Sequence, residues 1–124
     1  MSDGILIKDN HLAFVPAAEL LRRAKESRSP LHGIEIEVQD LNTLAEVLKN
    51  PPDVIMLDNF SLEALPAAIR KIRESSGSRI EVSGGVSLEN VRNIAELRPD
   101  YISVGALTHS VRSLNLTMDY EVKR

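Results

Sequence analysis

Residues 34–57 read IEIEVQDLNTLAEVLKNPPDVIML and contain one complete strand–helix–strand pattern. The runs 34–38 and 54–57 are short and rich in β-branched residues, which is typical of β-strands. Between them, apolar residues recur at the spacing of one helix face: Leu41, Leu44, Ala45 and Leu48. Asp40 suits the helix N-cap, because its carboxylate can accept a free backbone N–H. The prolines at 51–52 end this helix before the second strand.

The same alternation continues on both sides of this stretch. Further strand-like runs lie at 4–7, 80–82 and 101–104. Three more helical stripes separate the runs: Ala17, Leu20, Leu21 and Ala24; Leu62, Leu65, Ile69 and Ile72; and Leu88, Val91 and Ala95. Strands joined through helices are parallel, with right-handed crossovers. The sequence therefore predicts an α/β fold of about five parallel strands with alternating helices.

Prolines and small polar residues place the other helix boundaries. Pro16 suits a first helical turn, and Ser87 is expected to be an N-cap. Pro66 would break its helix unless that helix starts near Leu65. Pro99 ends the last helix before the final strand.

Five strand–helix units are too few for a closed barrel, which needs about eight strands and about 250 residues. We expect a single domain over residues 1–124, either a small open sheet or a partial, open, TIM-like β/α barrel. Such a sheet leaves strand edges uncovered. The chain is therefore expected to form a homo-oligomer or to need a complementing partner.

Composition narrows the class of function. The 124 residues are 43% hydrophobic and 27% charged, as in a globular domain, and contain no Cys for disulfides or thiolate chemistry. A net charge of −3 and 3% aromatic residues argue against nucleic-acid binding. No apolar run approaches a membrane span, and the start lacks a signal-peptide pattern, so a cytoplasmic protein is expected.

Ligands of parallel α/β folds bind at the carboxyl ends of the strands. Glu35 and Glu37 share one face of their strand, where an unpaired charge is expensive. With Asp58 at the next strand end, Glu37 could hold Mg²⁺ beside a phosphorylated ligand. The alternatives remain open: a solvated face, an Arg that neutralises the glutamates, and Asp58 as a helix cap.

Glycines and a lysine occupy the other strand ends. Ser83-Gly84-Gly85 precedes a helix, and Gly105 begins a loop that contains His109; both segments can offer backbone N–H groups to an anion. Plain turns and an exposed histidine explain the same residues. Lys8 can bind a carboxylate or phosphate, although most lysines are simply solvated. Taken together, these residues predict a site for a phosphorylated ligand with a divalent cation.

Five segments resemble motifs of the quinolinate phosphoribosyltransferase family, also called nicotinate-nucleotide pyrophosphorylase (carboxylating). They are similar to its LIKDNH, EVEV, MLDN, SGGI and ISVGALTHS motifs, and they occur in the family's order. The segments are Ile5–His11, Glu35–Val38, Met56–Asn59, Ser83–Val86 and Ile102–Ser110.

The resemblance implies an open α/β barrel that transfers ribose 5-phosphate from phosphoribosyl pyrophosphate to quinolinate. Pyrophosphate and CO₂ leave, and nicotinate mononucleotide is formed for NAD biosynthesis. Lys8 would bind a quinolinate carboxylate, and Glu37 and Asp58 would bind the ribose hydroxyls and Mg²⁺. The remaining matched residues would hold phosphate groups: Ser83, Gly84, Gly85, Gly105 and His109.

Family chains also have an N-terminal domain and early barrel strands, whose basic residues clamp quinolinate. The matched segment is the C-terminal part of that barrel, so the expectation is a chain that is incomplete without a complementing N-terminal portion. Three alternatives remain: a non-catalytic domain that binds a phosphorylated metabolite, one subunit of a split enzyme, and a related phosphoribosyltransferase with another substrate.

Overall fold

The computed structural model describes residues 4–105 and contains one parallel five-stranded sheet in the order β1-β2-β3-β4-β5. The strands are β1 (Gly4–Ile7), β2 (Gly33–Val38), β3 (Val54–Asp58), β4 (Arg79–Ser83) and β5 (Tyr101–Ile102). The helices are α1 (Asp9–Leu12), α2 (Ala17–Ser27), α3 (Leu41–Val47), α4 (Leu65–Ser75) and α5 (Val91–Glu96). All strand pairs are parallel, so the predicted α/β fold with alternating helices is confirmed.

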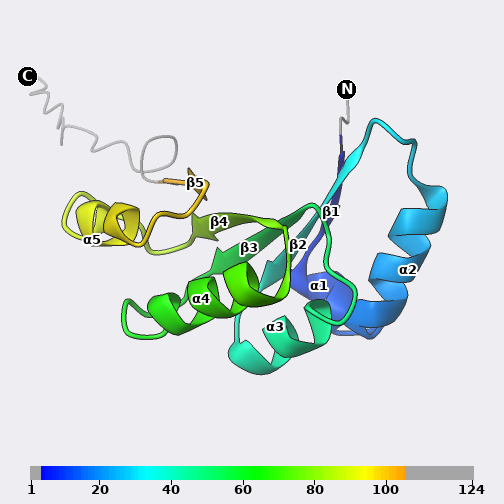
Figure 1. Ribbon diagram of the computed structural model, residues 1–124, viewed down its shortest axis with the longest axis horizontal. Helices are drawn as coiled ribbons and strands as arrows, with labels where there is room; N and C mark the ends of the chain where they lie inside the picture. The colour runs from blue at the N-terminus through cyan, green and yellow to red at the C-terminus, as the bar shows by residue number, and fades with distance from the viewer. Residues whose placement is uncertain (1–3, 106–124) are drawn as a thin grey trace, which may run out of the picture.

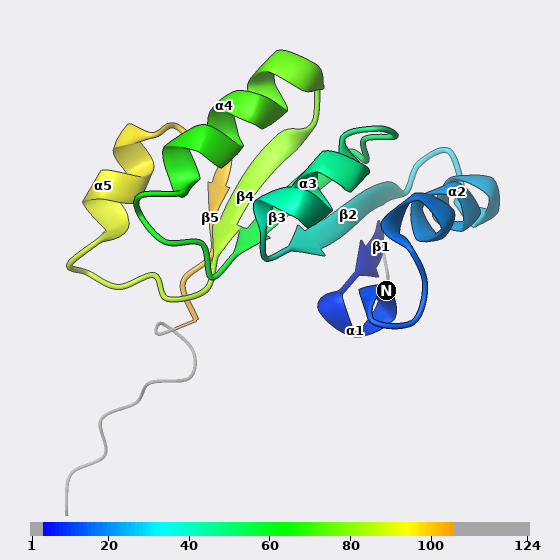
Figure 2. The same ribbon diagram turned by 90° about the horizontal axis from the view of Figure 1, so that it is seen from below.

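The strand order has a direct consequence for the two faces of the sheet. Strands that follow one another in chain order, without the reversal of a doubly wound sheet, place every crossover helix on the same side. Figure 1 shows α3 and α4 against one face of the sheet, with α2 and α5 flanking them; within residues 4–105, no helix lies over the opposite face. The perpendicular view in Figure 2 shows these helices side by side along the strands. This is one wall of an open barrel.

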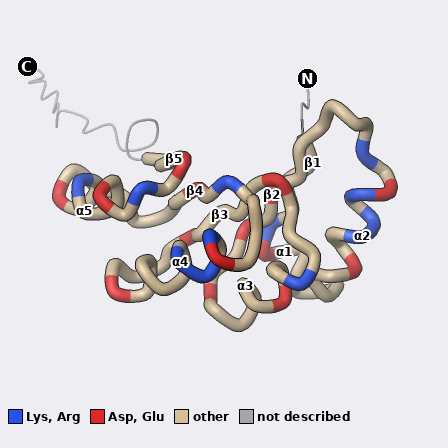
Figure 3. The backbone as a smooth tube through the Cα atoms, in the orientation of Figure 1, with Lys and Arg blue, Asp and Glu red and all other residues tan. Residues whose placement is uncertain are grey.

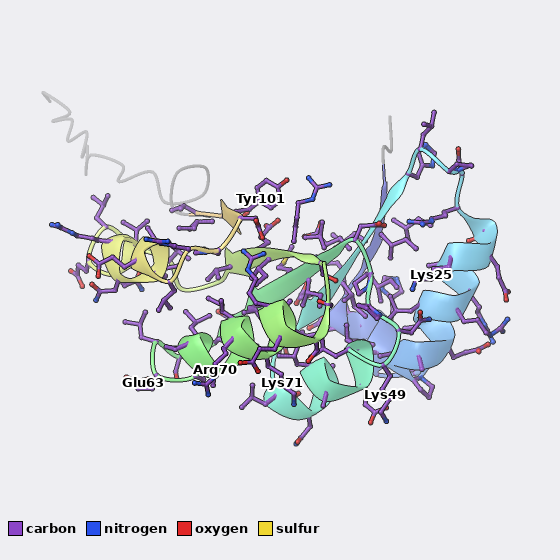
Figure 4. All side chains as sticks on the ribbon, viewed as in Figure 1. Lys25, Lys49, Glu63, Arg70, Lys71 and Tyr101 are labelled. Carbon is purple, nitrogen blue, oxygen red and sulfur yellow. The ribbon has the colours of Figure 1, made fainter. Side chains whose placement is uncertain are left out.

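Strand residues alternate between the two faces. Ile34, Ile36 and Val38 of β2 are fully buried and pack with Ile55 and Leu57 of β3 under the helices. The helix layer completes this core with Leu21, Ala24, Leu44, Val47, Ala68, Ile72 and Ile94. The intervening residues point to the uncovered face. Figure 4 shows Tyr101 on that side, whereas Lys49, Arg70 and Lys71 project from the helix layer.

Most predicted helix boundaries are confirmed. The carboxylate of Asp40 accepts hydrogen bonds from the backbone N–H groups of Asn42 and Thr43, as an N-cap does. Helix α4 begins at Leu65, so Pro66 lies in the first turn, where its missing N–H costs nothing.

The expected cap at Ser87 is wrong. Helix α5 begins four residues later, after a turn in which the Ser87 carbonyl accepts hydrogen bonds from Asn90 and Val91. Leu88 is 94% exposed in this turn and does not join the helix stripe. The one-turn helix α1, directly after β1, was not predicted either. At its N-cap, the Lys8 N–H donates a hydrogen bond to Nδ1 of His11 at 3.0 Å.

Charges on the helix layer are largely paired with one another. Arg22 bonds Glu19 and Glu26, and Arg23 also bonds Glu19, all on the exposed face of α2. Figure 3 shows acidic and basic residues interspersed along α2, α4 and α5. These residues form solvated helix faces. Among residues 4–105, no helix combines the length and apolar character needed to cross a membrane.

Two aspartates at the amino ends of the strands make the same set of hydrogen bonds, here called the aspartate anchor. Asp53, just before β3, accepts hydrogen bonds through Oδ2 from Arg28 at 2.6 Å and from the N–H of Ile34 at 2.7 Å. Asp100, just before β5, accepts from Arg73 at 2.9 Å and from the N–H of Ile80 at 2.7 Å. Each aspartate therefore ties the preceding strand and its helix to the next strand.

Replacing Asp53 is expected to lower the stability of the fold and to have no other effect. Asp53→Ala leaves the Arg28 guanidinium and the Ile34 N–H without their acceptor, which should lower the free energy of unfolding by about 2 kcal/mol. Urea denaturation measures the change. The matched control is Glu46→Ala, which removes an exposed ion pair with Lys49 and should cost less than about 0.5 kcal/mol. Equal effects of the two substitutions would show that the anchor has no special weight.

Candidate functional site

The predicted site residues lie at the carboxyl ends of the strands, beside the uncovered face. Asp58 at the end of β3 pairs in register with Ser83 at the end of β4. Glu37 of β2 is opposite Met56 of β3, two residues before Asp58 on the same strand face. The parallel sheet therefore brings Glu37, Asp58 and the Ser83 loop to one edge, as the sequence predicts.

A third carboxylate and an amide complete this group. Nε2 of Gln39 lies 3.3 Å from Oε1 of Glu37, 3.4 Å from Oδ2 of Asp9 and 3.5 Å from Oδ2 of Asp58. Asp9 comes from helix α1, which places it at this edge. The three carboxylates thus surround one weakly held amide donor.

Burial and neighbouring negative charges disfavour the ionised form of Glu37. Its side chain is only 8% exposed, and burial raises the pKa of its carboxyl above the ordinary range. The charges of Asp58 and Asp9 raise this pKa further, while the Gln39 hydrogen bond and the charge of Lys8 lower it. A cation at this edge would therefore be attracted by a group that the protein itself leaves under-compensated.

The carboxylate oxygens of this cluster are donors of the kind that a magnesium ion accepts. Magnesium is held in proteins by one or two carboxylates together with water and phosphate oxygens. Glu37 and Asp58 supply such carboxylates, with Asp9 close by. Within residues 4–105, no group of three or more acidic or histidine side chains is arranged to hold a metal by itself. The arrangement suits a shared metal rather than an all-protein metal site.

The glycine loop after β4 has the backbone geometry of an anion site. Gly84 and Gly85 both have positive φ, at 74° and 62°. In the described part of the chain, their N–H groups donate to no other group. Asn90 holds the loop by donating from Nδ2 to the Gly85 carbonyl at 2.9 Å and accepting from the Ser87 N–H at 2.8 Å. Successive unpaired N–H groups suit a phosphate.

The other predicted residues are less closely gathered. Lys8 is exposed at the N-cap of α1, and its charge acts on Glu37. Gly105 follows β5 at the end of the described residues, and His109 lies outside them. Asp58 caps no helix, because α4 begins seven residues later. Asn59 lies in the Met56–Asn59 motif, but the sequence assigned it no role. Gln39 was not singled out, since a neutral amide gives no signal until its carboxylate partners are known.

Glu35 has a partner that sequence reasoning did not foresee. No Arg neutralises it among residues 4–105; its carboxyl instead interacts with that of Glu81 of β4, whose Oε1 accepts a hydrogen bond from Ser103 at 2.5 Å. Burial, followed by the charge and hydrogen bond of Glu81, raises the pKa of Glu35 to about 7. Oε1 of Glu35 is buried and finds no hydrogen-bond partner within residues 4–105. The uncovered face thus contains a carboxyl pair that holds a proton near neutral pH.

Comparison with known proteins gives a consistent result. Residues 1–119 match the family model described as the C-terminal domain of quinolinate phosphoribosyl transferase. The chain is 44% identical over 124 residues to the probable nicotinate-nucleotide pyrophosphorylase (carboxylating) of Methanocaldococcus jannaschii. It is 41% identical over 121 residues to the nicotinate-nucleotide pyrophosphorylase (carboxylating) of Mycobacterium leprae. These matches cover 96% of this chain but only 44% and 42% of the two relatives.

Solved structures agree with the sequence matches. The crystal structure of NadC from Streptococcus pyogenes superposes with a TM-score of 0.79 at 38% identity, over 96% of this chain and 41% of that one. A NadC deletion mutant superposes with a TM-score of 0.81 at 38% identity, over 92% and 40%. The neighbours therefore share both the fold and substantial sequence with this segment.

The glycine loop predicts different costs for two similar substitutions. A Cβ on Gly84 would clash with Oδ1 of Asn59 and lie 2.7 Å from its backbone N, whereas a Cβ on Gly85 meets nothing within 4 Å among residues 4–105. Gly85→Ala should cost about 1–2 kcal/mol from the left-handed backbone alone. Gly84→Ala adds the clash and should cost distinctly more in urea denaturation. Equal costs would contradict the close approach of Asn59.

The Glu35 pair predicts a pH dependence of stability. Between pH 4.5 and about 7 the folded chain holds a proton on Glu35 that the unfolded chain releases, so the pair destabilises the fold as pH rises and its effect levels off above pH 7. Glu35→Gln should raise the free energy of unfolding by about 1–2 kcal/mol at pH 8 relative to its effect at pH 4.5, after allowance for solvent screening. Urea titrations at both pH values measure this. Glu74→Gln, on the exposed face of α4, is the control that should show no such slope.

Proposed function

The chain belongs to the quinolinate phosphoribosyltransferase family, and from this we propose that it provides the phosphoribosyl-binding part of a nicotinate-nucleotide pyrophosphorylase (carboxylating). The reaction is the transfer of ribose 5-phosphate from phosphoribosyl pyrophosphate to the nitrogen of quinolinate in NAD biosynthesis. The single observation that carries the proposal is the placement of Glu37 and Asp58 beside the Gly84–Gly85 loop at one sheet edge.

The chemistry explains why carboxylates and N–H groups are needed together. Cleavage of the C1–O bond develops positive charge on the ribose and negative charge on the departing pyrophosphate. Glu37 and Asp58 favour the positive sugar and can accept hydrogen bonds from its hydroxyls, while the loop N–H groups bind phosphate oxygens. Mg²⁺, when bound, supplies positive charge to the pyrophosphate.

Quinolinate binding, attack by its nitrogen and loss of CO₂ involve few of the described residues. Lys8 would bind one quinolinate carboxylate as a point charge. The pyridine nitrogen attacks with its own lone pair, so no general base is required. A ring carboxyl then leaves as CO₂, and a proton takes its place on the ring carbon. Further phosphate contacts would come from Gly105 and His109.

We further propose that the complete site forms only together with the rest of a family chain or with a second copy. The segment spans 44% of the length of its Methanocaldococcus jannaschii relative. Within the described residues, strand β1 has a partner on one side only, so its other edge is available for pairing. A cytoplasmic location accords with the expected role in NAD synthesis.

One observation favours a second function, binding without turnover. The site described here combines three carboxylates with a single lysine, whereas quinolinate carries two carboxylates. Such a site suits a magnesium–phosphoribosyl ligand better than quinolinate. The deciding experiment mixes the chain with the separately produced N-terminal portion of a family enzyme and assays nicotinate mononucleotide. Product formation supports the enzyme. Binding of phosphoribosyl pyrophosphate without product supports the second function.

Asp58→Asn tests the role of the carboxylate. It should weaken Mg²⁺-dependent binding of phosphoribosyl pyrophosphate at least about tenfold, because the group loses its charge while keeping its size. Stability should change by less than about 0.5 kcal/mol, as for most surface substitutions away from the core. Calorimetry and urea denaturation measure the two effects. The control is Asp40→Asn, since Asn caps a helix about as well as Asp; unchanged affinity in Asp58→Asn would contradict the metal-side role.

A further inference from the structure

Asn59 lies between the two halves of the proposed site. It follows Asp58 at the end of β3, and its backbone N–H donates to the Ser83 carbonyl at the end of β4 at 3.0 Å. Its side chain reaches Asp58 on one side and lies against Gly84 on the other. Asn59 therefore contacts both the carboxylate cluster and the glycine loop.

The Asn59 side chain fixes one oxygen of Asp58. Its Nδ2 donates to Oδ2 of Asp58 at 2.7 Å, the shorter of the two hydrogen bonds that this carboxylate accepts from residues 4–105. Gln39 approaches the same oxygen from 3.5 Å. In residues 4–105, Oδ1 of Asp58 takes part in no hydrogen bond, so Asn59 restrains rotation of the carboxylate and leaves one oxygen for a ligand.

The backbone of Asn59 explains why this residue type is needed. Its φ is +55°, a left-handed conformation that asparagine, aspartate and glycine tolerate best. Glycine fits this backbone but has no donor. Aspartate also fits, but it would place a second carboxylate against Asp58. Asparagine alone among these three satisfies both the backbone and the hydrogen bond.

We propose that Asn59 is a positioning residue that orients the Asp58 carboxylate toward the magnesium–phosphoribosyl ligand. This inference rests on the proposed function and goes beyond it by assigning the orientation of Asp58 to a residue that itself need not touch the ligand. The backbone of Asn59 supports the fold of the loop, whereas its side-chain amide supports binding. These two contributions can be separated by substitution.

Three substitutions separate them. Asn59→Gly keeps the backbone conformation and removes the amide; Asn59→Ala removes the amide and strains the backbone; Asn59→Asp keeps size and backbone but replaces the donor by an acceptor. Asn42→Asp is the control for added charge, because Asn42 is exposed on helix α3. Each variant of the full chain is titrated calorimetrically with phosphoribosyl pyrophosphate in the presence of Mg²⁺, and its urea midpoint is measured.

We expect the dissociation constant to rise about tenfold or more in all three Asn59 variants, with unchanged stoichiometry. The urea midpoint should fall more for Asn59→Ala than for Asn59→Gly, and Asn42→Asp should resemble the wild type in affinity. Wild-type affinity in Asn59→Gly would overturn the positioning role while leaving the proposed function intact. A loss of binding stoichiometry that follows the urea midpoint would also overturn it, because that pattern indicates a structural role only. Absence of binding by the wild-type chain, both alone and mixed with the N-terminal portion of a family enzyme, would refute the proposed function and the inference with it.

Discussion

The one-sided covering of the sheet is the constraint on which the rest of the molecule depends. Five parallel strands in chain order place their helices on one face, and the apolar alternate residues of each strand fill that side. The opposite residues are then free of the core, so Glu35, Glu37, Asp58 and Glu81 can share a face without displacing apolar packing. A sheet covered on both faces would have no room for four carboxylates.

The two ends of the strands have different tasks. At the amino ends, Asp53 and Asp100 each bind an arginine and a strand N–H through one oxygen. Their charges are therefore neutralised within the fold. At the carboxyl ends, the hydrogen bonds that Glu37 and Asp58 accept from residues 4–105 come from the amides of Gln39 and Asn59. Stability and binding can thus vary separately, as in β/α barrels generally.

Local signals in the sequence predict what local physics decides. The strand runs, the Asp40 cap and the Pro66 boundary follow from periodicity and backbone chemistry, and the meeting of strand ends follows from parallel topology. Ser87 failed as a cap because the Asn90 side chain stabilises a turn that delays the helix. The Glu35–Glu81 interaction and the contacts of Gln39 with Asp9 and Asp58 could not be predicted, since each depends on distances between strands. The Asn59 hydrogen bond joins neighbours in the chain, but it depends on a left-handed backbone that the sequence does not show.

The two carboxylate groups of the uncovered face resolve their repulsion in different ways. Glu35 and Glu81 lie on the same face of the sheet, on either side of β3, and burial raises the pKa of Glu35 to about 7, so a proton relieves the repulsion there. Glu37, two residues nearer the strand ends, has its pKa raised by burial and by Asp58 and Asp9, and it adjoins the glycine loop. A cation carried by a phosphorylated ligand can reach Glu37. The attraction between the cation and the Glu37 carboxylate stabilises the bound ligand, and protonation of Glu37 would remove this attraction. The Glu35–Glu81 pair lies farther from the strand ends and is internal. The Glu37 group lies at the strand ends and is therefore available for binding.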